Sequence, residues 1–176
     1  MSEAQRARVE QKLRFAKLHL EELAAAPTGR GDDFERAHYE AVLSQLLGTY
    51  DAFLGELNLV LGCGRAAGDV TLGKLRESLM KQGRSSEAVR RLYAMQEDET
   101  CWLRQLQDLR HASTHRSGIP LAFHMGGPRH GKVVFKHPAT LDELPTLASE
   151  TLEAWWDKMV ALVAELRELA VNERAG

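Results

Sequence analysis

The residue types that could do chemistry gather in one stretch of the chain, between Asp108 and Asp142. No acidic residue lies between these two aspartates, and five of the chain's seven histidines do. The stretch also holds five cations, so its local charge is +5. Subtracting this from the net charge of −2 leaves a charge of −7 on the rest of the chain. The cations are Arg110, Arg116, Arg129, Lys132 and Lys136. Such a surface favours a phosphate or another anion as ligand, and the alternative is a solvated loop with incidental histidines.

Histidine and arginine side chains in this stretch, such as His115 and Arg110, are of types that could act on RNA. Cleaving RNA without a metal needs a base for the 2′-hydroxyl, an acid for the leaving oxygen and fixed positive charge beside the phosphorane. Histidine can serve either proton-transfer role near neutral pH, and arginine binds phosphate through two parallel hydrogen bonds. Five positions on a helix turn about 500°, so the two side chains leave it about 140° apart. We expect them to converge only where the helix ends within the stretch or across a dimer.

Residues 110–115, Arg-His-Ala-Ser-Thr-His, resemble the R-x4-6-H motif of the HEPN superfamily. The polar His111 after the arginine is similar to that pattern, as is the position near the end of a penultimate helix. HEPN domains are helical bundles, often dimeric, and many are metal-independent ribonucleases. The resemblance implies that Arg110 and His115 are a catalytic pair, that His111 supports them, and that the chain forms a homodimer.

The chain departs from the HEPN toxins at two points. Ser113 and Thr114 stand where the toxins often have apolar residues, and no tyrosine follows His115 closely, so the resemblance gives no support to regulation through such a tyrosine. Over its whole length the chain is also similar to an uncharacterised bacterial family of unknown function. Two functions stay open: an endoribonuclease, and a catalytically silent dimer that binds nucleotide, RNA or a protein partner through the same basic surface.

A metal site in a helical bundle is a further use of the same side chains. Asp108, His111 and His115 recur at i, i+3 and i+7, which places them on one helical face where ligands can build a metal centre. His19 and His38 could add ligands from the first two helices. The chain has no HExxH motif and no pair of ExxH motifs. We therefore expect no metal and no other cofactor.

Composition and periodicity predict an all-α single domain. The chain has 176 residues, of which 44% are hydrophobic and 27% charged, and this fits one domain with its own core. Few aromatic residues and abundant Ala, Leu and Glu favour helix over strand. Apolar stripes predict long helices over 2–26, 32–61 and 148–169, a penultimate helix over 96–115, and two shorter segments, one from Asp69 or Thr71 to Gly83 and one from Ser85. We expect an antiparallel four-helix bundle.

The ends of the later elements have their own signals. Glu97, Asp98 and Glu99 suit the start of the penultimate helix, through its dipole, although that helix could continue from the one before. Residues 118–138 contain two apolar segments around a Gly-rich turn, which predicts an inserted loop or a small hairpin within 116–140. Thr140 and Glu143 have the spacing of a capping box, and Pro145 just after it permits the last helix to begin.

Three further features indicate the environment of the protein. Cys63 and Cys101 fit neither a disulfide framework nor a metal clip, and so are expected to be small buried residues in a reducing compartment. Charges within residues 1–8 argue against a signal peptide, and no run of about 18 uncharged residues is present. A cytoplasmic protein with no membrane contact is expected.

Trp155 and Trp156 are expected in core or dimer packing rather than base stacking.

Overall fold

The computed structural model describes residues 3–26, 33–115 and 118–175, and these are mostly helical, as the sequence predicted. A two-stranded antiparallel sheet and two short 3-10 turns, Ala67–Asp69 and Gly127–Arg129, complete the described elements. The helices are α1 (Glu3–Ala25), α2 (Asp33–Val60), α3 (Leu72–Lys81), α4 (Glu87–Glu97), α5 (Trp102–His115) and α6 (Ala148–Ala175), and the strands are β1 (Leu121–Phe123) and β2 (Val133–Phe135).

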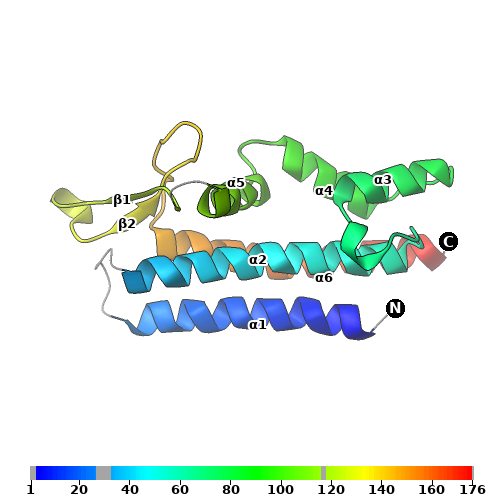
Figure 1. The fold of residues 1–176 in the computed structure, drawn as a ribbon, viewed down its shortest axis with the longest axis horizontal. Helices are drawn as coiled ribbons and strands as arrows, with labels where there is room; N and C mark the ends of the chain where they lie inside the picture. Colours follow the sequence, from blue (N-terminus) through cyan, green and yellow to red (C-terminus); the bar gives the residue numbers. More distant parts are fainter. Residues whose placement is uncertain (1–2, 27–32, 116–117, 176) are drawn as a thin grey trace.

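Three long helices, α1, α2 and α6, lie side by side and form the body of the molecule (Figure 1). α1 runs opposite to α2 and α6. The helices α3 and α4 lie at the end where the chain begins and finishes, and the β1–β2 hairpin lies at the other end. α5 packs on α2 and α4 and lies across the long helices rather than along them. The arrangement therefore differs from four antiparallel helices, because α2 and α6 share a direction and α5 crosses them.

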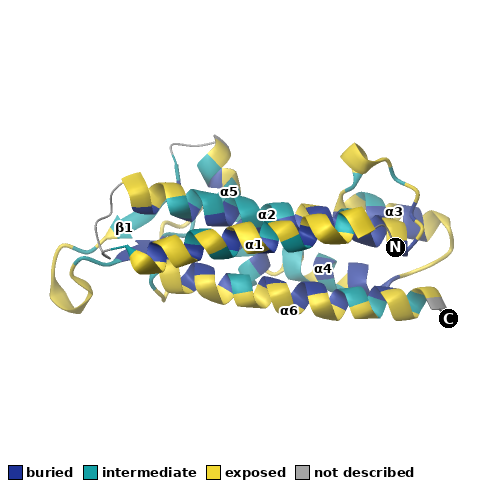
Figure 2. Cartoon of the chain, turned by 90° about the horizontal axis from the view of Figure 1, so that it is seen from below, coloured by how far each residue is buried: buried dark blue, intermediate teal, exposed yellow. Residues whose placement is uncertain are grey.

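The core follows the apolar stripes that the sequence predicted. The buried side chains of α1 recur at steps of three and four residues, and they are Val9, Leu13, Ala16, Leu20 and Leu23. α2 is buried on a wider arc, since α1, α6 and α5 all pack on it. Figure 2 shows this pattern as dark bands along the facing sides of the helices. Burial of these stripes, rather than helix propensity, supplies most of the driving force for the fold.

The stop and start signals of α2 and α3 are found where the sequence placed them. Gly62 follows α2 with a φ of 67°, and Gly83 follows α3 with a φ of 66°, a left-handed conformation that glycine adopts without strain. Thr71 caps α3, its hydroxyl oxygen accepting the Lys74 N–H. The predicted cap of α4, Ser85, was wrong by one residue. The hydroxyl of Ser86 accepts the Val89 N–H instead.

The predicted start of the penultimate helix was wrong. Glu97 is the last residue of α4 and Asp98 caps its end, so the acidic run does not begin α5. The Asp98 carboxylate accepts the Thr100 N–H at 2.9 Å and the Thr100 hydroxyl at 2.7 Å. Such local side-chain bonding competes with helical bonding, and it separates α4 from α5, which begins at Trp102.

The inserted segment forms the hairpin that was one of its two predicted conformations. β1 and β2 pair with Leu121 opposite Phe135 and Phe123 opposite Val133. An isolated hairpin of this size is marginal in water, but Phe135 is fully buried and packs edge-on against Tyr39 of α2 and stacked on Trp155 of α6. The hairpin is thus anchored to the bundle through one aromatic side chain.

The predicted capping box of Thr140 and Glu143 does not begin α6, which starts later, at Ala148. Glu150 Oε2 accepts the Leu147 N–H at 3.3 Å, but leucine has no side-chain acceptor, so only one of the two bonds of a capping box is present. Glu143 instead pairs through its backbone with Lys136, in an isolated antiparallel β-bridge. Its carboxylate accepts a hydrogen bond from His124 Nε2 in the tautomer that carries the ring proton there. Glu143 in the loop before α6 is therefore bonded to the hairpin, whereas Thr146 and Leu147 are bonded to the first turn of α6.

The tryptophans and cysteines lie inside the chain's own packing. Trp155 is buried in the core, and the Trp156 indole donates to the Leu13 carbonyl at 3.0 Å. Both cysteines are free thiols, Cys63 buried and Cys101 half-buried, and burial raises the pKa of Cys63. None of the described helices combines the length and the apolar character that crossing a bilayer requires.

Candidate functional site

The helix α5 carries the Arg110–His115 motif, and its backbone is helical through His115. α5 thus includes the whole motif and ends at its last residue. The side chain of His115 lies outside the described residues, as does Arg116. Convergence of the pair, within one chain or across a dimer, therefore stays a prediction.

Arg110 is held by the turn that follows it. Its Nη1 donates to Ser113 Oγ at 3.0 Å. The Ser113 and Thr114 hydroxyls in turn donate to the Arg110 carbonyl at 3.0 and 2.8 Å. Of the two residues at which the chain departs from the HEPN toxins, Ser113 therefore orients the guanidinium, and both bond the last turn of α5.

A groove of about 510 Å³ runs along α5 beside α2. Within it Arg104 donates from Nε to Asp108 at 2.9 Å, and hydrogen bonding to Asp108 raises the pKa of Arg104. This pair is neutral overall, so the groove keeps the positive charge of Arg110. Its lining residues are Leu47, Arg104, Gln107, Asp108, Arg110, His111 and Thr114. The Arg110 guanidinium can bind an anion in this groove, beside the imidazole of His111.

The metal centre predicted at Asp108, His111 and His115 includes a side chain, that of His115, outside the described residues. Over residues 3–26, 33–115 and 118–175, His, Cys, Asp and Glu nowhere form a group of three or more that could hold a metal ion. Asp108 is bonded to Arg104. His19 and His38 contact each other, their Nδ1 atoms 3.3 Å apart. His38 precedes Leu47 of the α5 groove by nine positions, roughly 13 Å along α2.

The cations of the hairpin lie in other surroundings. Arg129 donates from Nη2 to the Pro145 carbonyl at 3.2 Å, and its Nη1 is 3.8 Å from Glu143 Oε2. The same carboxylate lies 3.1 Å from the His124 ring. Glu143, the second acidic residue after the acid-free stretch, thus offsets part of the positive charge at the hairpin.

Lys132 and Lys136 are half-buried rather than displayed on an open surface. Lys132 lines a small hollow of about 50 Å³ together with Glu35 and Tyr39 of α2. Lys136 pairs through its backbone with Glu143. Neither lysine lines the groove that contains Arg110, so the four cations of the stretch that the structure describes are divided among different surroundings.

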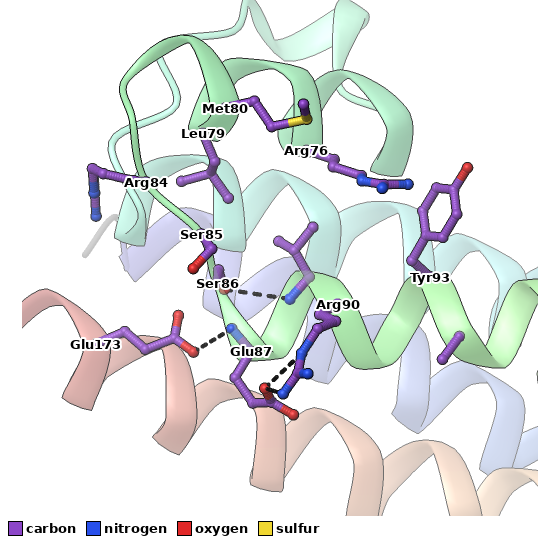
Figure 3. A pocket seen from close by; sticks show the side chains of 12 residues that line it. Arg76, Leu79, Met80, Arg84, Ser85, Ser86, Glu87, Arg90, Tyr93 and Glu173 are labelled. Carbon is purple, nitrogen blue, oxygen red and sulfur yellow. Dashed lines mark hydrogen bonds and ion pairs between the residues drawn. The ribbon is translucent and has the colours of Figure 1, made fainter.

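A second hollow, of about 820 Å³, lies between α3 and α4 and reaches the end of α6 (Figure 3). The Arg76 guanidinium lies 4.4 Å from the centre of the Tyr93 ring, and in the described part of the chain it has no carboxylate partner. Met80, one turn after Arg76 on the same helix, is largely exposed. The volume and the partly apolar lining suit a small organic molecule with an anionic group.

Glu173 of α6 completes this hollow at the first turn of α4. Its Oε1 accepts the Glu87 N–H at 2.7 Å and the Ala88 N–H at 3.4 Å (Figure 3), the position at which a helix favours negative charge. Its other oxygen is buried and has no partner among described residues. Sequence reasoning missed this contact because Glu173 lies 86 positions from Glu87, a separation at which helical periodicity carries no signal.

Comparisons with known proteins place the chain in a family without adding an activity. No curated protein and no solved structure matches it, and no match supports membership of the HEPN superfamily. The model of the Family of unknown function (DUF6586) matches residues 1–172, almost the whole sequence, and the chain belongs to that family.

Proposed function

We propose that this protein binds a phosphate-bearing ligand, RNA or a nucleotide, in the groove along α5. The observation that carries the proposal is the placement of Arg110 and His111 in one groove whose other charges, Arg104 and Asp108, are paired with each other. Arg110 is half-buried and oriented by Ser113. A guanidinium held in this way offers its remaining N–H groups to phosphate oxygens.

Metal-independent cleavage of RNA is the second candidate. It is favoured by the resemblance of residues 110–115 to the HEPN motif and by their place at the end of the helix that precedes the hairpin and α6. Catalysis requires Arg110 and His115 to act on one phosphate, either within one chain or across a homodimer in which one chain supplies the arginine and the other the histidine. The binding function needs no such pairing, and for that reason we place it first.

Fluorescence anisotropy with a labelled single-stranded RNA tests the proposal. Arg110→Ala is expected to weaken binding, and Arg110→Lys to restore only part of it, because a point charge does not reproduce two parallel hydrogen bonds. Arg76→Ala is the matched control, since it removes a cation that lies in the other hollow. Binding should also fall as salt rises.

The same titration with a mononucleotide separates the two ligands. Competition by the mononucleotide at the affinity of the RNA would assign the groove to a nucleotide. Equal loss of binding in Arg110→Ala and Arg76→Ala, or no loss in either, would contradict a site at α5.

A further inference from the structure

We propose that the outward side of α1, with the adjoining side of α2, is the interface of a homodimer in which α1 packs antiparallel on α1 of a second copy. The outward side of α1 is exposed along its length (Figure 2). Three large apolar side chains lie exposed on this α1–α2 face: Phe15 at 40%, Leu18 at 56% and Phe34 at 41%. Apolar side chains gathered on an exposed surface mark a site of interaction.

The packing of α1 on α2 brings these side chains together. The centre of the His38 ring lies 4.3 Å from that of Phe34 and 5.2 Å from that of His19. Phe15 is one turn before His19 on α1, and Leu18 is three positions after Phe15, so these residues occupy neighbouring turns. The α1–α2 face therefore has an apolar and aromatic centre built from two helices.

The charges on the two halves of α1 select a second copy as the occupant. Arg8 and Arg14 lie in the first half of the helix, and Glu21 and Glu22 lie in the second half. All four are exposed, and within the described part of the chain none of them forms an ion pair. An antiparallel copy places cations against carboxylates at both ends of the contact, whereas a parallel copy opposes like charges. The face is therefore complementary to itself about a two-fold axis.

The apolar centre and the charges agree on one register. With the axis midway between Phe15 and Leu18, each Phe15 lies against Leu18 of the other copy. Arg8 and Arg14 then lie within about one helical turn of the positions that oppose the two glutamates. Arginine side chains are long enough to span that offset, so one register satisfies both the apolar and the charged groups.

The size of the α1–α2 face suits a stable dimer. α1 has 23 residues and so is about 35 Å long, and two helices side by side are about 20 Å wide. Their product is about 700 Å² on each copy, close to the roughly 800 Å² that each partner of a specific complex buries. α1 and α2 also make the most extensive contact in the fold, so the face is presented by a rigid pair.

The proposed interface leaves the α5 groove open. α5 packs on α2 and α4, and it lies on the other side of α2 from α1 (Figure 1). The dimer therefore does not rest on the proposed function, and Arg110→Ala should leave it unchanged.

Sedimentation equilibrium over a range of concentrations tests the dimer. Leu18→Glu is expected to raise the dissociation constant at least about tenfold, because it places like charges together beside the axis in place of apolar contacts. Met80→Glu is the matched control, since Met80 is an exposed apolar residue of α3. Circular dichroism of each variant shows whether the bundle is intact.

A charge exchange tests the two-fold arrangement directly. One variant combines Arg8→Glu with Arg14→Glu, and the other combines Glu21→Arg with Glu22→Arg. Each should be monomeric alone, because its α1 then carries a single sign of charge, and an equimolar mixture should form a heterodimer. Wild-type protein that is monomeric at hundreds of micromolar would overturn the proposal. So would a dimer that persists in Leu18→Glu, or a mixture of the two charge variants that does not associate.

Discussion

Arg167 of α6 binds the carboxylate of Glu56 in α2 through two hydrogen bonds, from Nε at 2.7 Å and from Nη2 at 3.0 Å. The same guanidinium reaches Glu10 of α1 at 3.2 Å. The Glu56 side chain is only 1% exposed, and hydrogen bonding to it raises the pKa of Arg167. One arginine therefore connects all three long helices inside the bundle.

Arg167→Ala should strongly destabilise the protein. The substitution leaves the Glu56 carboxylate buried without its cation, and removing one partner of a buried pair costs about 3–5 kcal/mol. Urea denaturation measures the change. Arg91→Ala is the control, because the Arg91–Glu165 pair is exposed and such pairs contribute at most about 1 kcal/mol. Equal effects of the two substitutions would show that Arg167 contributes no more than a surface arginine.

Ser113→Ala should weaken RNA binding less than Arg110→Ala does. The substitution removes the hydroxyl that orients the Arg110 guanidinium while keeping its charge, and one such hydrogen bond is worth about 0.5–1.5 kcal/mol. Anisotropy titrations at two salt concentrations separate the cases. The salt dependence should be unchanged in Ser113→Ala and reduced in Arg110→Ala. An effect of Ser113→Ala as large as that of Arg110→Ala would contradict a purely positioning role for the serine.

If the protein cleaves RNA, His115→Ala and Arg110→Ala should each abolish cleavage without unfolding the bundle. General acid–base catalysis is worth about 10²–10⁴-fold, so the loss of His115 is measurable. The products should end in 2′,3′-cyclic phosphate, because the substrate's own 2′-hydroxyl is the nucleophile, and DNA should survive. A mixture of the two inactive variants should regain activity if the site is shared between chains. Light scattering that shows a monomer at tens of micromolar would count against shared catalysis.

His19 should make folding stability depend on pH on the acid side of neutrality. Burial and His38 lower its pKa in the folded state, so the unfolded chain takes up a proton first as the pH falls below about 6.5. Stability is then complete above that pH and declines until the folded-state pKa is passed. Thermal melts between pH 8 and pH 5 measure this. His19→Gln should flatten the profile relative to wild type, and an unchanged profile would refute the assignment.

Local sequence signals determined the helices, because periodicity and capping act over a few residues. The stripe of α1 and the Gly62 and Gly83 stops are found where predicted, and Thr71, one of the two predicted starts of α3, caps that helix. The signals failed where two neighbouring candidates competed, as at Ser85 and Ser86. They failed too where a side chain bonded locally outside a helix, as Asp98 does with Thr100.

Tertiary packing alone decided which distant side chains meet. The hairpin cations share an acid-free stretch of sequence with Arg110, yet Arg129 lies beside Glu143, Lys132 lines the hollow beside α2, and none of them lines the Arg110 groove. His19 and His38, on different helices, come within hydrogen-bonding distance because α1 and α2 pack antiparallel. Glu173 reaches the start of α4 because α4 packs on α6. Such contacts depend on the direction and rotation of whole helices, which no local pattern of residues encodes.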